Sequence, residues 1–321
     1  MTSIVKVDSR PRIVAEGLSI LFFAVVVAAA NCLSLAVIIF PELGALASDV
    51  MLRPAGKWAK EPWKLIATPV VTAALGIAIG RYFPFSAGTI LFAMTLCIGV
   101  VFALRSKVAP AISAGILPIV LGVKSWLYPV SVLCSLILLT VLLIVWKQTP
   151  YGKALIPIRG KDDRAVDILE SPPHAKAWFP ALFLFVAVMG TAAQLTTWRF
   201  LLFPPLIVMA YEMLGHPTTC PWAKQPYPFP VVCTLAAAFG VVCVKVLGVT
   251  PIAASVSLVV TYGVMRTCRL RMPPALAVGL IPLVIEAPSW KYAASVGIGT
   301  TALTVWFLIY RRLLLPLRIS P

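Results

Sequence analysis

Two acidic residues occupy matching places in the two halves of this 321-residue chain. Asp49 and Glu212 each lie in a short apolar segment that follows a Phe-Pro pair. A carboxylate in such a segment is costly to bury and often functional, and the chemistry that it offers is the binding and release of a proton. The alternative is structural: both carboxylates are solvated near a helix end, or they pair with Arg53 or Lys224.

A second group of residues interrupts the short apolar segments. Proline removes a backbone donor and glycine permits close backbone approach, so a helix that breaks there exposes backbone groups that can hold a small solute. Packing is the alternative, because small residues also let helices lie close together. The predicted substrate-binding residues are Phe40, Pro41, Gly44, Pro110, Ser113, Gly115, Pro118, Phe203, Pro204, Pro273, Pro274, Gly279 and Pro282.

Motifs of familiar enzymes are missing from the sequence. There is no G-x-x-x-x-G-K-[ST] phosphate loop, no H-E-x-x-H helix and no G-x-S-x-G elbow. The two histidines are scattered, and the seven cysteines form no C-x-x-C pair, so the ligand spacing of a metal site is lacking. We therefore expect no enzyme activity, no cofactor and no metal ion.

Composition indicates that these residues are carried on membrane helices. The chain is 60% hydrophobic and only 12% charged, with a mean hydropathy of +0.98. Its apolar runs match the thickness of a bilayer core, where backbone groups must be satisfied within helices. The sequence thus predicts an all-α polytopic membrane protein. The net charge of +16 is explained by basic cytoplasmic loops, so we expect no nucleic-acid partner.

The chain repeats itself at an offset of 163–164 residues. The matching stretches are 40–41 and 203–204, 58–63 and 222–227, 73–76 and 237–240, 110–118 and 274–282, and 125–128 and 289–292. We predict about 12 membrane segments, six in each of two parallel, pseudo-symmetric repeats. The repeats would cover 1–146 and 177–321, with a cytoplasmic linker at 147–176. The expected segments are 13–39, 40–53, 65–82, 86–104, 108–123 and 126–146, then 177–199, 201–214, 229–247, 250–266, 272–287 and 290–312.

Basic residues predict the orientation. They gather at the N-terminus, at 53–64, at 105–107, in the linker, at 266–271 and at the C-terminus, and the positive-inside rule places all of these in the cytoplasm. The expected location is the inner membrane of a bacterial-type cell, with both termini cytoplasmic. Arg81 and Lys245 fall at matching positions toward the other side, where they attract an anion or only reach the membrane interface.

Each half resembles the HPP family of integral membrane proteins. The resemblance lies in Phe40-Pro41-Glu42-Leu43-Gly44-Ala45, in 58–62, in 110–118 and in Trp126, and again in the matching stretches of the second half. The histidine of the family's His-Pro-Pro motif is absent from both halves, where Val108-Ala109-Pro110 and Met272-Pro273-Pro274 stand instead. The resemblance implies transport, and nitrite is the solute attributed to some members.

Short, interrupted segments at matching positions in two halves are the usual sequence sign of a transport site. We therefore predict a secondary transporter or facilitator for a small solute, and we expect this solute to be an anion. The alternatives are an intramembrane enzyme or lipid-handling protein that uses buried carboxylates, and a membrane scaffold without transport. The expected partners are the lipid bilayer and a small molecule or ion, and the sequence leaves a homo-oligomer open.

Overall fold

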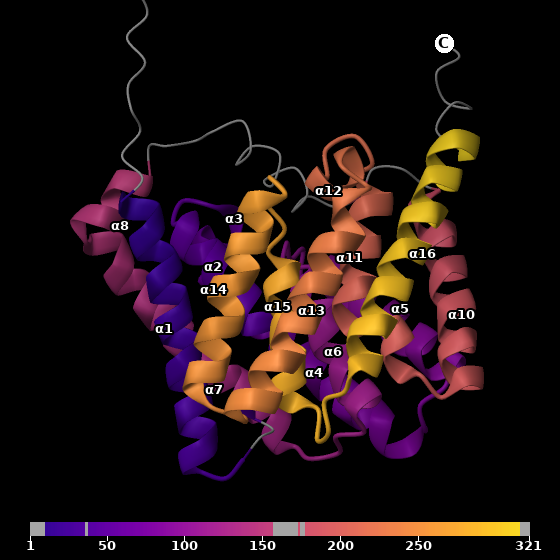
Figure 1. The fold of residues 1–321 in the computed structure, drawn as a ribbon, viewed down its shortest axis with the longest axis horizontal. Coiled ribbons are helices and arrows are strands. Elements are labelled where there is room, and N and C mark those ends of the chain that lie inside the picture. Colours follow the sequence, from indigo (N-terminus) through magenta and orange to yellow (C-terminus); the bar gives the residue numbers. More distant parts are fainter. Residues whose placement is uncertain (1–9, 36–37, 157–172, 174–176, 315–321) are drawn as a thin grey trace, which may run out of the picture.

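The computed structural model describes residues 10–35, 38–156, 173 and 177–314, and in these ranges the regular structure is helical throughout (Figure 1). The helices up to the linker are α1 (Arg10–Cys32), α2 (Glu42–Leu52), α3 (Lys57–Lys60), α4 (Pro62–Tyr82), α5 (Ala87–Ala103), α6 (Pro110–Leu121), α7 (Leu127–Gln148) and α8 (Pro150–Leu155). Those after it are α10 (Trp178–Thr196), η2 (Arg199–Leu202), α11 (Pro204–Gly215), α12 (Pro221–Lys224), α13 (Pro228–Leu247), α14 (Pro251–Thr267), α15 (Pro274–Leu280), η3 (Ile281–Val284) and α16 (Trp290–Leu314).

Six of these helices are long and apolar enough to cross a bilayer: α1, α4, α7, α10, α13 and α16. The protein is therefore a multi-pass helical membrane protein, as the composition predicts. Twelve full spans are not found in the described part, because the other predicted segments are shorter helices. Two of these, α5 and α14, have 17 residues each, and α2, α6, α11 and α15 are shorter still.

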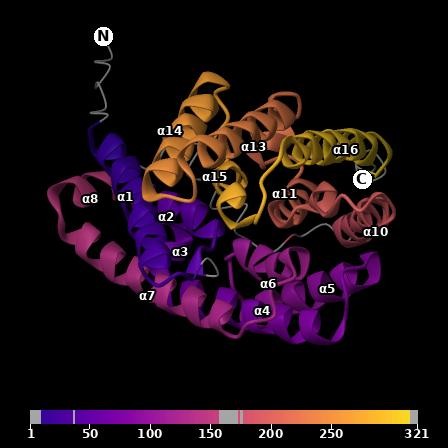
Figure 2. The same cartoon turned by 60° about the horizontal axis from the view of Figure 1, so that its bottom comes forward.

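The short helices lie inside a ring of longer ones. Figure 2 shows α2, α6, α11 and α15 in the middle, surrounded by α1, α7, α4, α5, α10, α16, α13 and α14. The inner helices also touch across the two halves of the chain, α2 packing against α15 and α6 against α11. Every residue of α11, and every residue of α2 except Leu52, is buried.

Side-chain chemistry explains this arrangement. The ring helices present large apolar side chains outward, and Leu21, Val141 and Val188 are each more than half exposed. Outward apolar residues are favourable only where lipid or another apolar surface replaces water. Small and polar side chains such as Thr72 and Thr300 are instead buried. The molecule thus has an apolar surface and a partly polar interior, as expected in lipid.

Glycines set how closely the inner helices approach the ring. A Cβ atom on Gly76 of α4 would lie 2.0 Å from the carbonyl oxygen of Gly115 on α6. A Cβ atom on Gly240 of α13 would lie 2.2 Å from the carbonyl oxygen of Gly279 on α15. Only glycine fits at these contacts, so two of the predicted substrate-binding residues, Gly115 and Gly279, take part in helix packing.

The first helix of each half packs on the other half. Helix α1 lies along α14, and α10 lies along α5. The Ser19 hydroxyl on α1 and the Tyr262 hydroxyl on α14 are 2.9 Å apart in a buried hydrogen bond that joins residues 243 positions apart. These contacts hold the two halves in one helical bundle.

Candidate functional site

Most of the predicted substrate-binding residues lie on the inner helices or at their first turns. Pro41 and Phe203 precede the first helical residues of α2 and α11, while Pro110, Pro204 and Pro274 are the first residues of their helices. Proline is well tolerated there, because the first N–H groups of a helix have no partner within it. Phe40 is buried against Tyr128, and Gly44 packs on α15. The remaining members are Ser113, Gly115 and Pro118 on α6, Pro273 before α15, Gly279 on α15 and Pro282 in η3.

Two prolines free backbone carbonyls, and two tyrosines bind them. Pro118 has no N–H to bond with the carbonyl of Ala114, four residues earlier. The Tyr128 hydroxyl donates to that carbonyl at 3.1 Å. In the second half Pro282 frees the carbonyl of Val278, and the Tyr292 hydroxyl donates to it at 2.7 Å. These carbonyls are therefore occupied within the protein, which favours packing over ligand contact for Pro118 and Pro282.

Replacing Tyr128 by phenylalanine should lower the free energy of unfolding by roughly 1–2 kcal/mol, because a buried carbonyl loses its donor. Unfolding in detergent would measure this effect. Tyr82→Phe is the matched control, since Tyr82 is 83% exposed. Equal stability of Tyr128→Phe and the control would contradict the role assigned to the hydroxyl.

The Asp49 carboxylate forms a buried, two-point ion pair on α2. Arg53 Nε donates to Oδ1 at 2.8 Å and its Nη2 to Oδ2 at 2.6 Å, and both side chains are at most 3% exposed. This is the pairing that the sequence left open as an alternative to proton coupling. In the second half, Glu212 on α11 and His216 directly after this helix are buried with the same four-residue spacing. Each half thus places an acidic residue one turn before a basic one.

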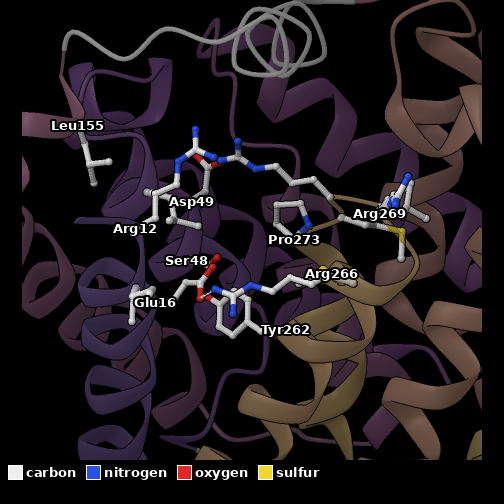
Figure 3. Close-up of a pocket in the computed structure, with 15 residues that line it drawn as sticks. Arg12, Glu16, Ser48, Asp49, Leu155, Tyr262, Arg266, Arg269 and Pro273 are labelled. Carbon is white, nitrogen blue, oxygen red and sulfur yellow. Dashed lines mark hydrogen bonds and ion pairs between the residues drawn. The ribbon is translucent and has the colours of Figure 1, made fainter. Parts of the chain in front are cut away.

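A pocket of about 620 Å³ opens between α1, α2 and the end of α14 (Figure 3). In Figure 3, Arg12 and Asp49 lie close together, while Glu16, Ser48, Tyr262 and Arg266 meet below them. The full lining is Arg12, Ile13, Glu16, Ser48, Asp49, Leu52, Leu155, Tyr262, Met265, Arg266, Arg269, Leu270, Arg271, Met272 and Pro273.

The pocket carries an excess of positive charge. Four arginines line it against two carboxylates, and both carboxylates have arginine partners. Glu16 pairs with Arg266, and Asp49 pairs with Arg53, which is not itself a lining residue. Hydroxyl groups lie at its inner side, where Tyr262 bonds to Ser19 and Ser48. Guanidinium groups and hydroxyls together are suited to bind a small anion.

A second polar group lies deeper in the bundle. Glu42, the first residue of α2, is 2% exposed, and the Ser113 hydroxyl on α6 donates to its Oε1 atom. Its Oε2 atom has no hydrogen-bond partner. Ser113 lies two residues before Gly115, which packs on Thr72 near the middle of the membrane helix α4. The carboxyl group of Glu42 therefore lies well inside the bundle.

Among the residues that line the pocket, the sequence predicted only Asp49 and Pro273 as site residues, and it did not indicate a role for Glu42. Glu42 belongs to the Phe-Pro motif, but its counterpart in the second half is Pro205, so a search for matched carboxylates does not find it. In the sequence, Arg266 and Arg269 indicated only which side of the membrane their loop lies on. The contact of Ser48 with Tyr262 joins distant parts of the chain, and no local pattern indicates it.

The cations on the other side of the bundle are held over aromatic rings. The Arg81 guanidinium carbon lies 5.7 Å from the centre of the Trp126 ring, and Lys245 Nζ lies 5.9 Å from that of Trp290. Both contacts are within the range of a cation–π interaction. Arg81 Nε also donates to the Lys124 carbonyl at 3.0 Å. These contacts favour interfacial anchoring for Arg81 and Lys245.

Comparison with known proteins finds no matching family model, curated protein or solved structure. Within the described ranges, no group of three or more His, Cys, Asp or Glu side chains is placed to hold a metal ion. The features that bear on function are therefore the pocket and the buried polar groups of α2.

Proposed function

We propose that this protein moves a small anion across the membrane as a secondary transporter or facilitator. The observation that carries the proposal is the arginine-lined pocket, which ends on the short inner helix α2. A pocket that reaches a short, buried helix inside a ring of longer helices resembles the central sites of transporters, which are formed by short or broken helices within the bundle. A scaffold would need neither the pocket nor short helices buried inside the ring.

The proposed architecture is two parallel, pseudo-symmetric repeats at 1–146 and 177–321, joined by a cytoplasmic linker at 147–176, of which 157–172 and 174–176 lie outside the described residues. Equivalent contacts support it, since α1 packs on α14 and α10 on α5, while α2 packs on α15 and α11 on α6. The Tyr128 and Tyr292 bonds are also equivalent. Arg105 and Arg269 support the same relation, because both have a positive φ, at 47° and 50°.

The pocket is proposed to face the cytoplasm of a cell with a bacterial-type inner membrane. Arg12, Arg266, Arg269 and Arg271 line it. Figure 1 shows the start of α1 and the end of α14 on the same side as α3 and α12. Lys64 and Lys107 are on that side as well, through their contacts with Arg105 and Glu61. Basic residues concentrate on the cytoplasmic side of membrane proteins, which also places the described N-terminal end there.

The substrate class follows from charge and size. Guanidinium groups favour carboxylate-like and oxyanion groups. The resemblance of each half to the HPP family suggests nitrite as the first solute to test. Nitrate, formate and sulfate differ from nitrite in shape or charge, so comparing their uptake with that of nitrite would define the selectivity of the protein.

Uptake into proteoliposomes tests the proposal. Purified protein is reconstituted and exposed to labelled nitrite, nitrate, formate or sulfate, and protein-free liposomes provide the background. We expect uptake of at least one of these anions above background and competition by the others according to affinity. Background rates for all four anions, with protein shown to be folded and inserted, would reject this substrate class.

A further inference from the structure

We propose that Glu42 is the proton-binding group of this transporter, taking up one proton for each singly charged anion that crosses. The inference rests on the proposed function and adds its coupling ion. The carboxylate gains a proton from water on one side of the membrane and the carboxylic acid releases it on the other side. Anion and proton then cross together without net charge movement.

The burial of Glu42 is the first argument. Its side chain is 2% exposed, and its Oε2 atom accepts no hydrogen bond. No lysine, arginine or histidine forms an ion pair with it in the described ranges. An ionised carboxylate without a counter-charge is strongly unfavourable in such a site. The group must therefore carry a proton or a bound cation whenever the site is closed to water.

The groups around Glu42 are hydroxyls and apolar side chains. On α6, Ser113 donates to Oε1. Tyr128 on α7 and Tyr292 on α16 are within electrostatic range, yet both hydroxyls donate to backbone carbonyls. The thiol of Cys97 is within range of Tyr128, and that of Cys233 within range of Tyr292.

The other charged groups near α2 have partners or lie elsewhere. Helix α15 contributes no titratable side chain, because its sequence is PALAVGL. The ionisable residues of α1 lie toward its two ends, and among them Glu16 is paired with Arg266 in the pocket. On α2 itself, Asp49 is paired with Arg53. On α2, Glu42 is thus the carboxyl group that is available to exchange a proton.

Connection to the pocket is the second argument. Glu42 and Asp49 are seven residues apart on α2, and this spacing puts them on one face of the helix, about 10 Å apart along its axis. Ser48 and Asp49 line the pocket. The proton site is therefore about two turns deeper than the place where the anion enters.

The asymmetry of the site is the third argument. At the positions equivalent to Glu42 and Ser113, the second half has Pro205 and Ala277. The donor and the acceptor of this hydrogen bond are thus both replaced by residues that cannot form it. The pair of Glu42 and Ser113 therefore has no equivalent in the second half, which is consistent with one proton per transport cycle.

Infrared spectroscopy of the reconstituted protein tests the proton site without any transport assay. The C=O stretch of a protonated carboxyl group should be present in the wild type and lost in Glu42→Gln. In Ser113→Ala the band should shift, because the hydroxyl no longer donates to the carboxyl group. Glu61→Gln is the matched control, since Glu61 lies at the surface with Lys64 and Lys107. An unchanged band in Glu42→Gln would overturn the proposal.

Anion uptake under an imposed proton gradient tests the coupling. We expect stimulation by an inward gradient in wild type and Glu61→Gln, and loss of that stimulation in Glu42→Gln. Loss in Asp49→Asn or Glu212→Gln with retention in Glu42→Gln would overturn the proposal, as would stimulation by sodium in place of protons. If wild type takes up no anion, the proposed function fails, whereas loss of the infrared band in Glu42→Gln would still identify Glu42 as an intramembrane proton site.

Discussion

Replacing Arg53 by glutamine is expected to lower the free energy of unfolding by about 3–5 kcal/mol, because the buried Asp49 carboxylate loses its directly bonded counter-charge. The ion pair between Arg53 and Asp49 is bidentate, and both side chains are almost fully excluded from solvent. Breaking one partner of such a pair costs far more than the net contribution of the intact pair. Reversible unfolding in detergent or bicelles measures the difference.

Two further variants separate this effect from the loss of a surface charge. The double variant Asp49→Asn/Arg53→Gln removes both charges and should recover much of the lost stability. Lys64→Gln breaks a partly exposed ion pair with Glu61, and such pairs contribute about 0–1 kcal/mol. If the double variant is as unstable as Arg53→Gln alone, the loss does not come from an uncompensated Asp49 charge.

Replacing Arg269 by glutamine is expected to raise the half-saturating anion concentration about 10- to 100-fold. The variant removes one charge-assisted hydrogen bond, worth about 1.5–3 kcal/mol, and each 1.4 kcal/mol is about tenfold in affinity. Arg269 lines the pocket, and its side chain is exposed there. Initial uptake rates over a range of anion concentrations give the value.

The chain contains a matched control for this variant. Arg105 is the equivalent residue of the first half, is also exposed and has nearly the same backbone angle, but it does not line the pocket. Arg105→Gln changes net charge and backbone strain equally, and should leave the half-saturating concentration unchanged. Equal effects of the two variants would mean that the general surface potential, and not the pocket, attracts the anion.

The helices could be predicted from the sequence because each long apolar run has only one stable form in lipid. The predicted segments 65–82 and 229–247 agree closely with α4 and α13. Pro62 is the first residue of α4, and Gly248 directly follows the last residue of α13. The sequence only partly distinguished the helices that span the membrane from the short inner helices. Short length pointed to α2 and α6, but hydropathy does not show that a segment is enclosed by its neighbours.

The candidate site could be predicted less well, because its contacts cross between the halves. The pattern of prolines marks the inner helices, but no local pattern indicates that Tyr128 and Tyr292 are buried donors to backbone carbonyls. Matching of the halves identified Asp49 and Glu212 and passed over Glu42, whose equivalent is Pro205. Alignment of the two halves identifies residues that both halves contain, and it cannot identify a functional residue that is present in only one half.

The exchange of first helices between the halves has a consequence for biosynthesis. Helix α1 leaves the ribosome early, but its neighbour α14 is made only when most of the chain has been translated. Until then the faces of α1 and α2 that will meet α14 and α15 must be covered by lipid or by an insertion factor. The last third of the chain therefore completes a structure that the first third begins, and a ribosome that stops before α14 leaves a membrane intermediate exposed to quality-control proteases.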